Sequence, residues 1–241
     1  MNEITTIGLD LAKTVFQAHG VDSTDAVVMR KRLRRGEVIS FFAKAPACLI
    51  GMEACATAHY WARELTALGH EVRLMPPQYV KAYVKGNKND TADAEAICEA
   101  VKRPSMRFVP VKIVEQQSVL TMHRARDLLI RQHTMLINAL RGHLAEFGVI
   151  QACGQRGVAG LTAMVMDNQD RQIPTVARQV LKVIATHIHE LTKQIDTIEK
   201  QVLAWHKSNP LSLRQRFNDG SDSRQLSIQS RLQLLEICLQ L

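Results

Sequence analysis

The stretch ITTIGLD (4–10) decides the fold class, because it is a short apolar run that ends in a carboxylate. Residues 14–21 and 26–32 follow as two more strand-like segments, and the turn-forming sequence DSTD (22–25) separates them. Three strands joined this tightly predict an antiparallel meander at the start of a mixed sheet. The chain therefore opens like an α/β domain.

The segments that follow continue to alternate between strand and helix. They are, in order, a helix over 37–44, a strand over 48–52 (CLIGM), a helix over 57–68, a strand over 71–75, a helix over 91–101 and an edge strand over 106–109. Gly69 is a natural end for the second helix, and Pro76 and Pro77 stop the strand before them. This order predicts an α/β fold with a mixed central sheet.

The pattern of the sequence changes near residue 113. Apolar residues recur at helical spacing over 114–147 and again over 176–206, with a loop predicted over 151–174 because of its glycines and proline. The second helix carries an apolar repeat in steps of three and four, made of Val180, Ile184, Ile188, Leu191, Ile195, Ile198, Val202 and Trp205. Such a repeat predicts the seam of a helical hairpin or coiled coil. The expected domains are therefore 1–112, 113–206 and a tail over 207–241.

Composition narrows the class of protein. The chain has 241 residues, of which 46% are hydrophobic, so a proper core is expected and wholesale disorder is not. We expect a cytoplasmic protein, because no apolar run is long enough for a membrane helix and the first residues do not resemble a signal peptide. The net charge of +8 favours a polyanionic partner. Five widely spaced cysteines with no C-x-x-C pair predict neither a zinc site nor a disulfide framework.

Four acidic residues form a candidate site. Asp10 and Glu53 end predicted strands, while Asp90 and Asp93 open a predicted helix and share one of its faces. Magnesium prefers oxygen ligands, and carboxylates that converge from separate elements can hold the ions that assist phosphoryl transfer. The alternative is structural: Asp90 as an N-cap, Asp93 and Glu53 as first-turn acids, and Asp10 as a turn former.

A family resemblance bears on that choice. The segments that carry it are IGLDLAK (7–13), GMEACATAHYWARELTALGHEVRLMPP (51–77), VKGNKNDTADAEAICEA (84–100) and RQHTMLINALRGHLAEFG (131–148). They resemble the DEDD transposases of insertion sequences, the IS one-ten family, in the same order and over most of residues 4–206. The resemblance implies a RuvC-like, ribonuclease H-like domain whose four acids bind Mg²⁺, here Asp10, Glu53, Asp90 and Asp93. It also implies recombination of double-stranded DNA guided by a structured RNA, and assembly into a dimer or tetramer.

Basic residues supply the candidate nucleic-acid contacts. They are the dense run Arg30, Lys31, Arg32, Arg34 and Arg35, the group Lys81, Lys85 and Lys88 near the acids in sequence, and Arg131 and Arg141 on the long helix. Such side chains suit phosphate contacts, although for any one of them a solvated surface is the alternative. Only 5% of the chain is aromatic, so a base-stacking platform is not predicted.

The end of the chain departs from the family. The family carries a second block after its coiled coil that supplies a nucleophilic serine, and the resemblance stops near Leu213. The codons of residues 217–221 can be chosen so that the +1 frame reads Leu-Met-Thr-Val-Pro, close to the usual opening of that block. We therefore expect a truncated or frameshifted family member, which the gene sequence would test.

Three other functions fit parts of the sequence. A RuvC-like junction resolvase would need only the amino-terminal domain, and the long helical segment 113–206 argues against it. The sequence GLDLAKT (8–14) could be the phosphate-binding strand of a sugar-kinase-like ATPase, but residues 100–241 lack Gly-rich adenosine-binding segments. A catalytically incomplete remnant that binds nucleic acid or dimerises is the third.

Overall fold

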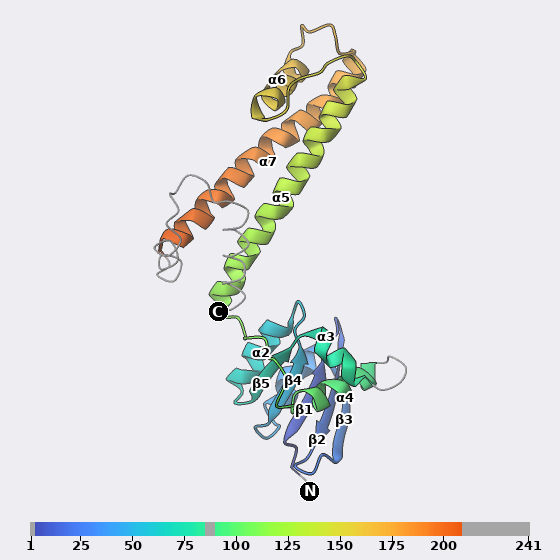
Figure 1. Cartoon of the computed structure of the whole chain (residues 1–241), viewed down its shortest axis with the longest axis vertical. Coiled ribbons are helices and arrows are strands. Elements are labelled where there is room, and N and C mark those ends of the chain that lie inside the picture. The colour runs from blue at the N-terminus through green and yellow to red at the C-terminus, as the bar shows by residue number, and fades with distance from the viewer. Residues whose placement is uncertain (1–2, 85–89, 209–241) are drawn as a thin grey trace. The chain divides into compact units, whose positions relative to one another are not determined.

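The computed structural model describes residues 3–84 and 90–208, without the side chains of Asp90 and Thr91. These residues fall into two compact units that meet in sequence at Gln116 and Gln117. The first unit contains the strands and the second the long helices (Figure 1). No helix within the described ranges has both the length and the apolar character needed to cross a lipid bilayer.

A five-stranded mixed sheet forms the centre of the first unit. Its strands are β1 (Thr6–Asp10), β2 (Val15–Val21), β3 (Val27–Arg34), β4 (Leu49–Glu53) and β5 (Glu71–Met75), in the spatial order β3-β2-β1-β4-β5. The first three are antiparallel neighbours, whereas β4 lies parallel to β1 and β5 parallel to β4. The predicted meander and mixed sheet are confirmed.

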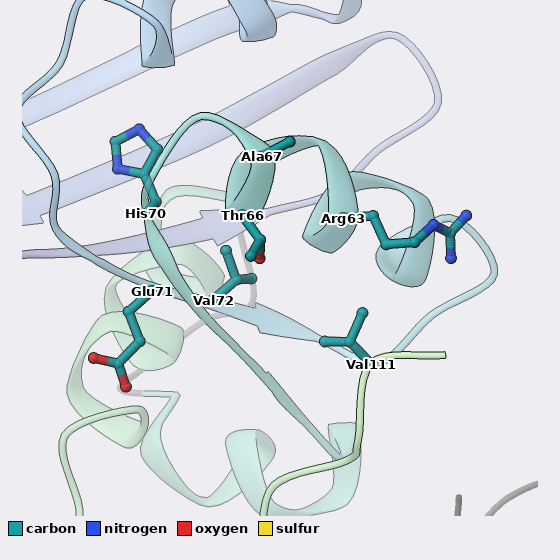
Figure 2. Close-up of a pocket in the computed structure, with 7 residues that line it drawn as sticks. All are labelled: Arg63, Thr66, Ala67, His70, Glu71, Val72 and Val111. Carbon is teal, nitrogen blue, oxygen red and sulfur yellow. The ribbon is translucent and has the colours of Figure 1, made fainter. Parts of the chain in front are cut away.

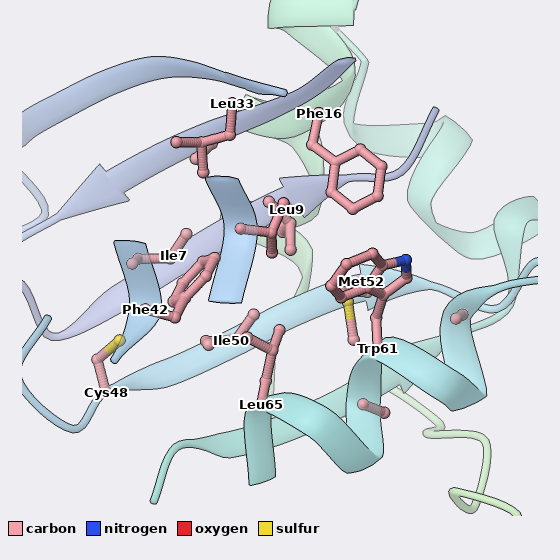
Figure 3. Close-up of a cluster of buried hydrophobic side chains, with 14 of the residues drawn as sticks. Ile7, Leu9, Phe16, Leu33, Phe42, Cys48, Ile50, Met52, Trp61 and Leu65 are labelled. Carbon is pink, nitrogen blue, oxygen red and sulfur yellow. The ribbon is translucent and has the colours of Figure 1, made fainter. Parts of the chain in front are cut away.

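Helices cover the sheet and complete its two cores. The short elements η1 (Arg35–Glu37) and α1 (Val38–Phe42) and the helix α2 (Ala58–Ala67) accompany the core of one face, where Ile7 and Leu9 of β1 pack with Phe42 and Trp61 (Figure 3). The other cluster joins α3 (Pro77–Val80) to α4 (Asp90–Ala100), with η2 (Lys81–Tyr83) between them in sequence. The strands at the centre of the sheet therefore have one face toward the core beside α2 and the other toward α4.

Two glycines allow α4 to lie directly on the strand backbones. A Cβ added at Gly8 of β1 would lie 2.1 Å from the carbonyl oxygen of Ala94 and 2.4 Å from the amide nitrogen of Cys98. A Cβ at Gly51 of β4 would lie 2.7 Å from the Cβ of Val101. Glycine is needed at both positions because no side chain fits between strand and helix. The glycines therefore set how close α4 comes to the sheet.

The turn between β2 and β3 is held by one carboxylate. Oδ1 of Asp22 accepts hydrogen bonds from the amide of Thr24 at 2.8 Å and the amide of Ala26 at 3.1 Å. Asp25 has a positive φ of 67°, a left-handed conformation that aspartate tolerates better than most residues. A register shift between Gly20 and Val21 follows in the ladder. Turn and bulge together fix which residues of β3 lie opposite β2.

The second unit is a helical hairpin with a short third helix. Its elements are α5 (Val114–Ala145), α6 (Gln155–Met166) and α7 (Thr175–Ser208). Nε of Arg126 donates to Oε1 of Glu199 at 3.0 Å, and His133 contacts the hydroxyl of Thr192 at 3.0 Å, so α5 and α7 run antiparallel. The predicted helical hairpin is confirmed, with its main core near the connection between the helices.

The prediction of a loop over 151–174 is wrong, because α6 occupies half of it. Leu161 and Val165, one turn apart, are buried in the hairpin core. Gly157 lies so close to the preceding loop that an added Cβ would meet the carbonyl oxygen of Ala152 at 1.8 Å. Gly157 is thus explained by close packing, which outweighs helix propensity, and Gly154 by its positive φ of 95° just before the helix.

Two smaller predictions also need correction. The seam of α7 begins one residue later than predicted, because Leu181 is buried while Val180 is 63% exposed. Here α6 packs against α7 and changes which face is covered. The predicted edge strand over 106–109 is reduced to one bridge, in which the amide of Val109 donates to the carbonyl of Leu74 at 2.8 Å.

A buried arginine closes the connection between α6 and α7. Nη1 of Arg178 donates to the carbonyl of Met164 at 2.6 Å, and Nη2 donates to the carbonyl of Asp170 at 2.6 Å. Further contacts join the guanidinium to the carbonyls of Val165, Asp167 and Ile173. One planar group with five donors thus satisfies a helix end and the loop after it.

Candidate active site

Asp10 and Glu53 are the last residues of two neighbouring parallel strands. The register of β1 and β4 pairs Leu9 with Met52, so the next positions along the two strands are Asp10 and Glu53. Adjacent strands lie about 4.8 Å apart, so the two acidic residues lie side by side where these two strands end. We call this end of the sheet the acidic edge. Both side chains are half-buried.

The two acids also share a face of the sheet. Leu9 and Met52 point into the core beside α2. Because side chains alternate along a strand, Asp10 and Glu53 lie on the opposite face, as Gly8 and Gly51 do. That is the face on which α4 packs.

Helix α4 carries the other two predicted acids toward this face. Ala94 lies over Gly8, and Ile97 is buried in the core beneath the helix. Asp90 precedes Ala94, and Asp93 precedes Ile97, by one helical turn of four residues. Both aspartates thus occupy positions that continue the sheet-facing stripe. Asp93 is half-buried, and the side chain of Asp90 lies outside the described residues.

The structure brings two of the four acids to adjacent positions, and it does not show a finished cluster. Among the described side chains, no group of three or more His, Cys, Asp or Glu residues is placed to hold a metal ion. The donor set is nevertheless of the kind that Mg²⁺ prefers, with carboxylate oxygens from separate elements. The structural alternative for Glu53 as a first-turn acid is wrong, because α2 begins only at Ala58. The four-acid site stays a prediction.

The basic run over 30–35 divides between the two faces of β3. Lys31 lies over the ring of Phe41, with Nζ 4.7 Å from its centroid, and Arg35 lies 5.2 Å from the ring of Trp61, both on the α2 side. Nη2 of Arg30 reaches Glu95 of α4 at 3.8 Å on the other side.

The alternation of the strand places the two remaining arginines of the run, Arg32 and Arg34, on the same face as Arg30. Both are exposed. The run is therefore not one continuous patch.

The other basic candidates are scattered. Lys81 is exposed at the start of η2, whereas Lys85 and Lys88 lie outside the described residues. Arg131 is exposed on α5. Arg141 is half-buried and donates to the carbonyl of Ala152 at 2.8 Å, so it holds the loop after α5, a contact that helical spacing alone did not reveal.

A depression of about 610 Å³ lies elsewhere on the first unit (Figure 2). It is lined by Arg63, Thr66, Ala67, His70, Glu71, Val72 and Val111. Glu71 pairs with Leu49 at the start of β4, whereas Glu53 is the last residue of that strand. The depression therefore lies at the opposite end of the sheet from the acids, beside α2, and is not part of the acidic site.

His19 lies beneath α4, and its burial should make the first unit less stable in acid. It is 3% exposed on β2, and burial lowers its pKa, while Glu95 raises the pKa and Arg30 lowers it. The unfolded chain takes up this proton at about pH 6.5, before the folded chain does, so acidification favours unfolding.

We therefore expect the melting temperature to fall less between pH 7 and pH 5 in His19→Gln than in the wild type. The matched control is His189→Gln, which changes an exposed histidine of α7 and should leave the acid sensitivity unchanged. A His19→Gln protein that loses stability as steeply as the wild type would contradict this assignment.

Comparison with known proteins decides the family. Residues 7–148 match the family model of the DEDD transposases of IS110 (one-ten) insertion sequences, described as "Transposase". The chain belongs to this family. The architecture agrees, because the mixed sheet in the order β3-β2-β1-β4-β5 is consistent with the RuvC, ribonuclease H-like domain that the resemblance implied, and the helical hairpin follows that domain in the chain.

Individual relatives agree with the DEDD transposase assignment. A probable family 20 transposase of Pseudomonas aeruginosa is 50% identical over 202 residues, which is 83% of this chain and 60% of the relative. The transposase of insertion sequence element IS1328 from Yersinia enterocolitica is 38% identical over 84% of this chain and 60% of its own length. That of IS1111A from Coxiella burnetii is 36% identical, over 87% and 57%. The chain thus spans somewhat more than half the length of these relatives.

Proposed function

We propose that this chain carries the nuclease site of an insertion-sequence transposase and cleaves a DNA strand with Mg²⁺. The observation that supports this most is the pair Asp10 and Glu53, side by side at the ends of β1 and β4 on the face covered by α4. Asp93, and Asp90 at the first position of α4, would complete the ligand set.

The proposed cleavage requires mainly that the protein hold carboxylate oxygen atoms rigidly in place. Bound Mg²⁺ supplies positive charge that stabilises the attacking and leaving oxygens of a phosphodiester. Asp10 pairs with a residue of β2 and Glu53 pairs with a residue of β5, so the backbone of each acid is held in the sheet. Asp93 is held through the contact of α4 with Gly8. Carboxylates on such elements keep their relative positions better than carboxylates on loops.

The wider reaction is proposed from the family. Strand exchange on double-stranded DNA, guidance by a structured RNA and assembly into a dimer or tetramer are what the resemblance implies. The net charge of +8 supports a polyanionic partner. The apolar seam of α7 would serve assembly if it also acts as a coiled coil between copies.

A second candidate function is nucleic-acid binding without cleavage. The net charge of +8 and the exposed Arg32 and Arg34 would support it without any metal site. A junction resolvase is disfavoured, because α5 and α7 form a long helical unit that such an enzyme would not need.

Metal binding tests the proposed site directly. We expect Asp10→Asn and Glu53→Gln each to weaken Mn²⁺ binding, measured by calorimetry, by at least about tenfold, since even the loss of residues that only orient ligands costs 10- to 100-fold. Asp127→Asn, which neutralises an exposed carboxylate on α5, is the matched control and should bind as the wild type does. Melting temperatures would confirm that all variants fold.

The outcomes separate the two candidates. Weaker Mn²⁺ binding in both site variants, with the control unchanged, supports the nuclease site. Unchanged affinity in Asp10→Asn and Glu53→Gln would remove that site and leave the non-catalytic function.

A further inference from the structure

The cross-strand register connects the basic strand β3 to the acidic edge. Arg32 pairs with Gln17 of β2, and Gln17 pairs with Asp10 of β1. Residues that lie directly opposite each other on neighbouring strands share a face of the sheet. Arg32, Gln17 and Asp10 therefore form one row across three strands, and Glu53 follows on the next strand.

The length of this row suits a nucleic-acid strand. Two strand spacings separate Arg32 from Asp10, which is about 10 Å between their backbones. One strand of B-form DNA rises about 3.4 Å per nucleotide, so the row spans about three nucleotides. A backbone with one phosphate beside Asp10 would thus have another within reach of the Arg32 side chain.

Ion pairs neutralise three other basic residues on this side of the sheet. Arg30 of β3 pairs with Glu95 of α4, Lys102 with Asp25 of the turn between β2 and β3, and Arg103 with Glu99 of α4. Arg32 and Arg34 form no ion pair within residues 3–84 and 90–208. Their positive charge remains available to a ligand.

The acidic edge needs such a charge. In the absence of bound metal, the carboxylates of Asp10 and Glu53 repel an approaching phosphodiester, and this repulsion extends over about 10 Å at moderate salt. Arg32 at the far end of the row, and Arg34 two residues further along β3 on the same face, offset that repulsion and hold the polynucleotide strand while its reactive phosphate lies near the acids. Gln17, which lies between Arg32 and Asp10, adds a neutral hydrogen-bonding group.

We propose that Arg32 and Arg34, with Gln17, form a phosphate-binding row that holds a polynucleotide backbone beside Asp10 and Glu53. Lys31 and Arg35 take no part, because they lie on the other face against Phe41 and Trp61. The inference rests on the proposed function only in taking the acids as the reactive end. Arginine suits the task, since its planar fork binds phosphate oxygens through two parallel hydrogen bonds.

Two double variants, one for each face of the basic run, test the proposal in the full chain. Arg32→Gln/Arg34→Gln and Lys31→Gln/Arg35→Gln each remove two positive charges from the same strand, one pair from each face. Binding of a short fluorescent DNA duplex and of a stem-loop RNA is measured in EDTA over a series of salt concentrations. Melting temperatures show whether each variant folds.

Arg32→Gln/Arg34→Gln, the row variant, should lose much more binding affinity than its control, Lys31→Gln/Arg35→Gln. Two lost phosphate contacts should weaken duplex binding by about 10- to 60-fold at 0.1 M salt and lower the salt slope by about 1.8, since each contact contributes about 0.9. Lys31→Gln/Arg35→Gln should keep the wild-type slope. Gln17→Glu, which keeps both arginines but places a negative charge inside the row, should also weaken binding.

The outcomes are decisive for the row. Equal losses in the two double variants would show that only net charge matters and would overturn the proposal, as would wild-type binding by the row variant. A loss confined to DNA, confined to RNA or shared by both supports the row and identifies the backbone it holds. Because EDTA removes metal, these results are independent of Mn²⁺ binding by Asp10 and Glu53, which the row variant should retain.

Discussion

Replacing Gly8 with alanine should displace α4 from the sheet and destabilise the first unit by about 1–3 kcal/mol or more, the usual cost of overpacking a core. The new methyl carbon would overlap backbone atoms of Ala94 and Cys98, and backbone atoms have no side-chain rotation by which to move away. Asp93 moves with α4, so Mn²⁺ affinity should fall as well. Chemical denaturation measures the loss of stability.

Cys98 reports the same displacement without any activity assay. Its thiol is 2% exposed, and burial raises its pKa to about 11, so it should resist alkylation at neutral pH. In Gly8→Ala, Cys98 should be alkylated faster, while the exposed Cys55 reacts equally in all variants. Gly36→Ala is the matched control, because an added Cβ there meets nothing within 4 Å. Unchanged stability and unchanged Cys98 protection in Gly8→Ala would refute the close contact.

Replacing Arg178 with methionine should lower the free energy of unfolding of the second unit by about 3 kcal/mol or more. A single unpaired buried polar group costs about 1–3 kcal/mol, and this change strands several carbonyls at once. They include those of Met164, Asp170 and Ile173, at the end of α6 and in the loop after it. Arg178→Lys should restore little, because one ammonium group does not span both sides of the loop.

Hydrogen exchange would show where in the second unit Arg178→Met acts. Amides over 155–173 should exchange faster in Arg178→Met, while those in the middle of α5 should keep their protection. Arg171→Met removes an exposed arginine from the same loop and should leave both stability and exchange unchanged. An Arg178→Met protein that is as stable as Arg171→Met would show that the guanidinium does not hold the loop.

The strands were predictable because local signals and burial agree in them. The apolar run before Asp10 and the run before Glu53 are central strands, and the strand predicted over 71–75 is confirmed residue for residue. Their terminal carboxylates could be placed at a sheet edge for the same reason. That the two acids share a face came from the register, which a single strand does not reveal.

The remaining differences arise where tertiary packing decides. Glycine is a poor helix former, so the sequence predicts a loop where α6 lies, although Gly157 allows the close contact with Ala152. The sequence does not distinguish Arg178 from other basic residues of a helix, because its carbonyl partners lie on the preceding loop and helix end. The basic run of β3 is one cluster in the sequence and two sets in the structure, because alternate residues face opposite sides of the sheet.

The turn between β2 and β3 has a consequence for how such proteins can vary. Deleting one residue between Asp22 and Ala26 would slide β3 by one position and exchange its two sets of cations. Lys31 and Arg35 would then face the carboxylates, and Arg32 would meet the aromatic rings, although the amino-acid composition would hardly change. The length of the β2–β3 turn, more than the number of arginines, therefore decides which cations face the acids.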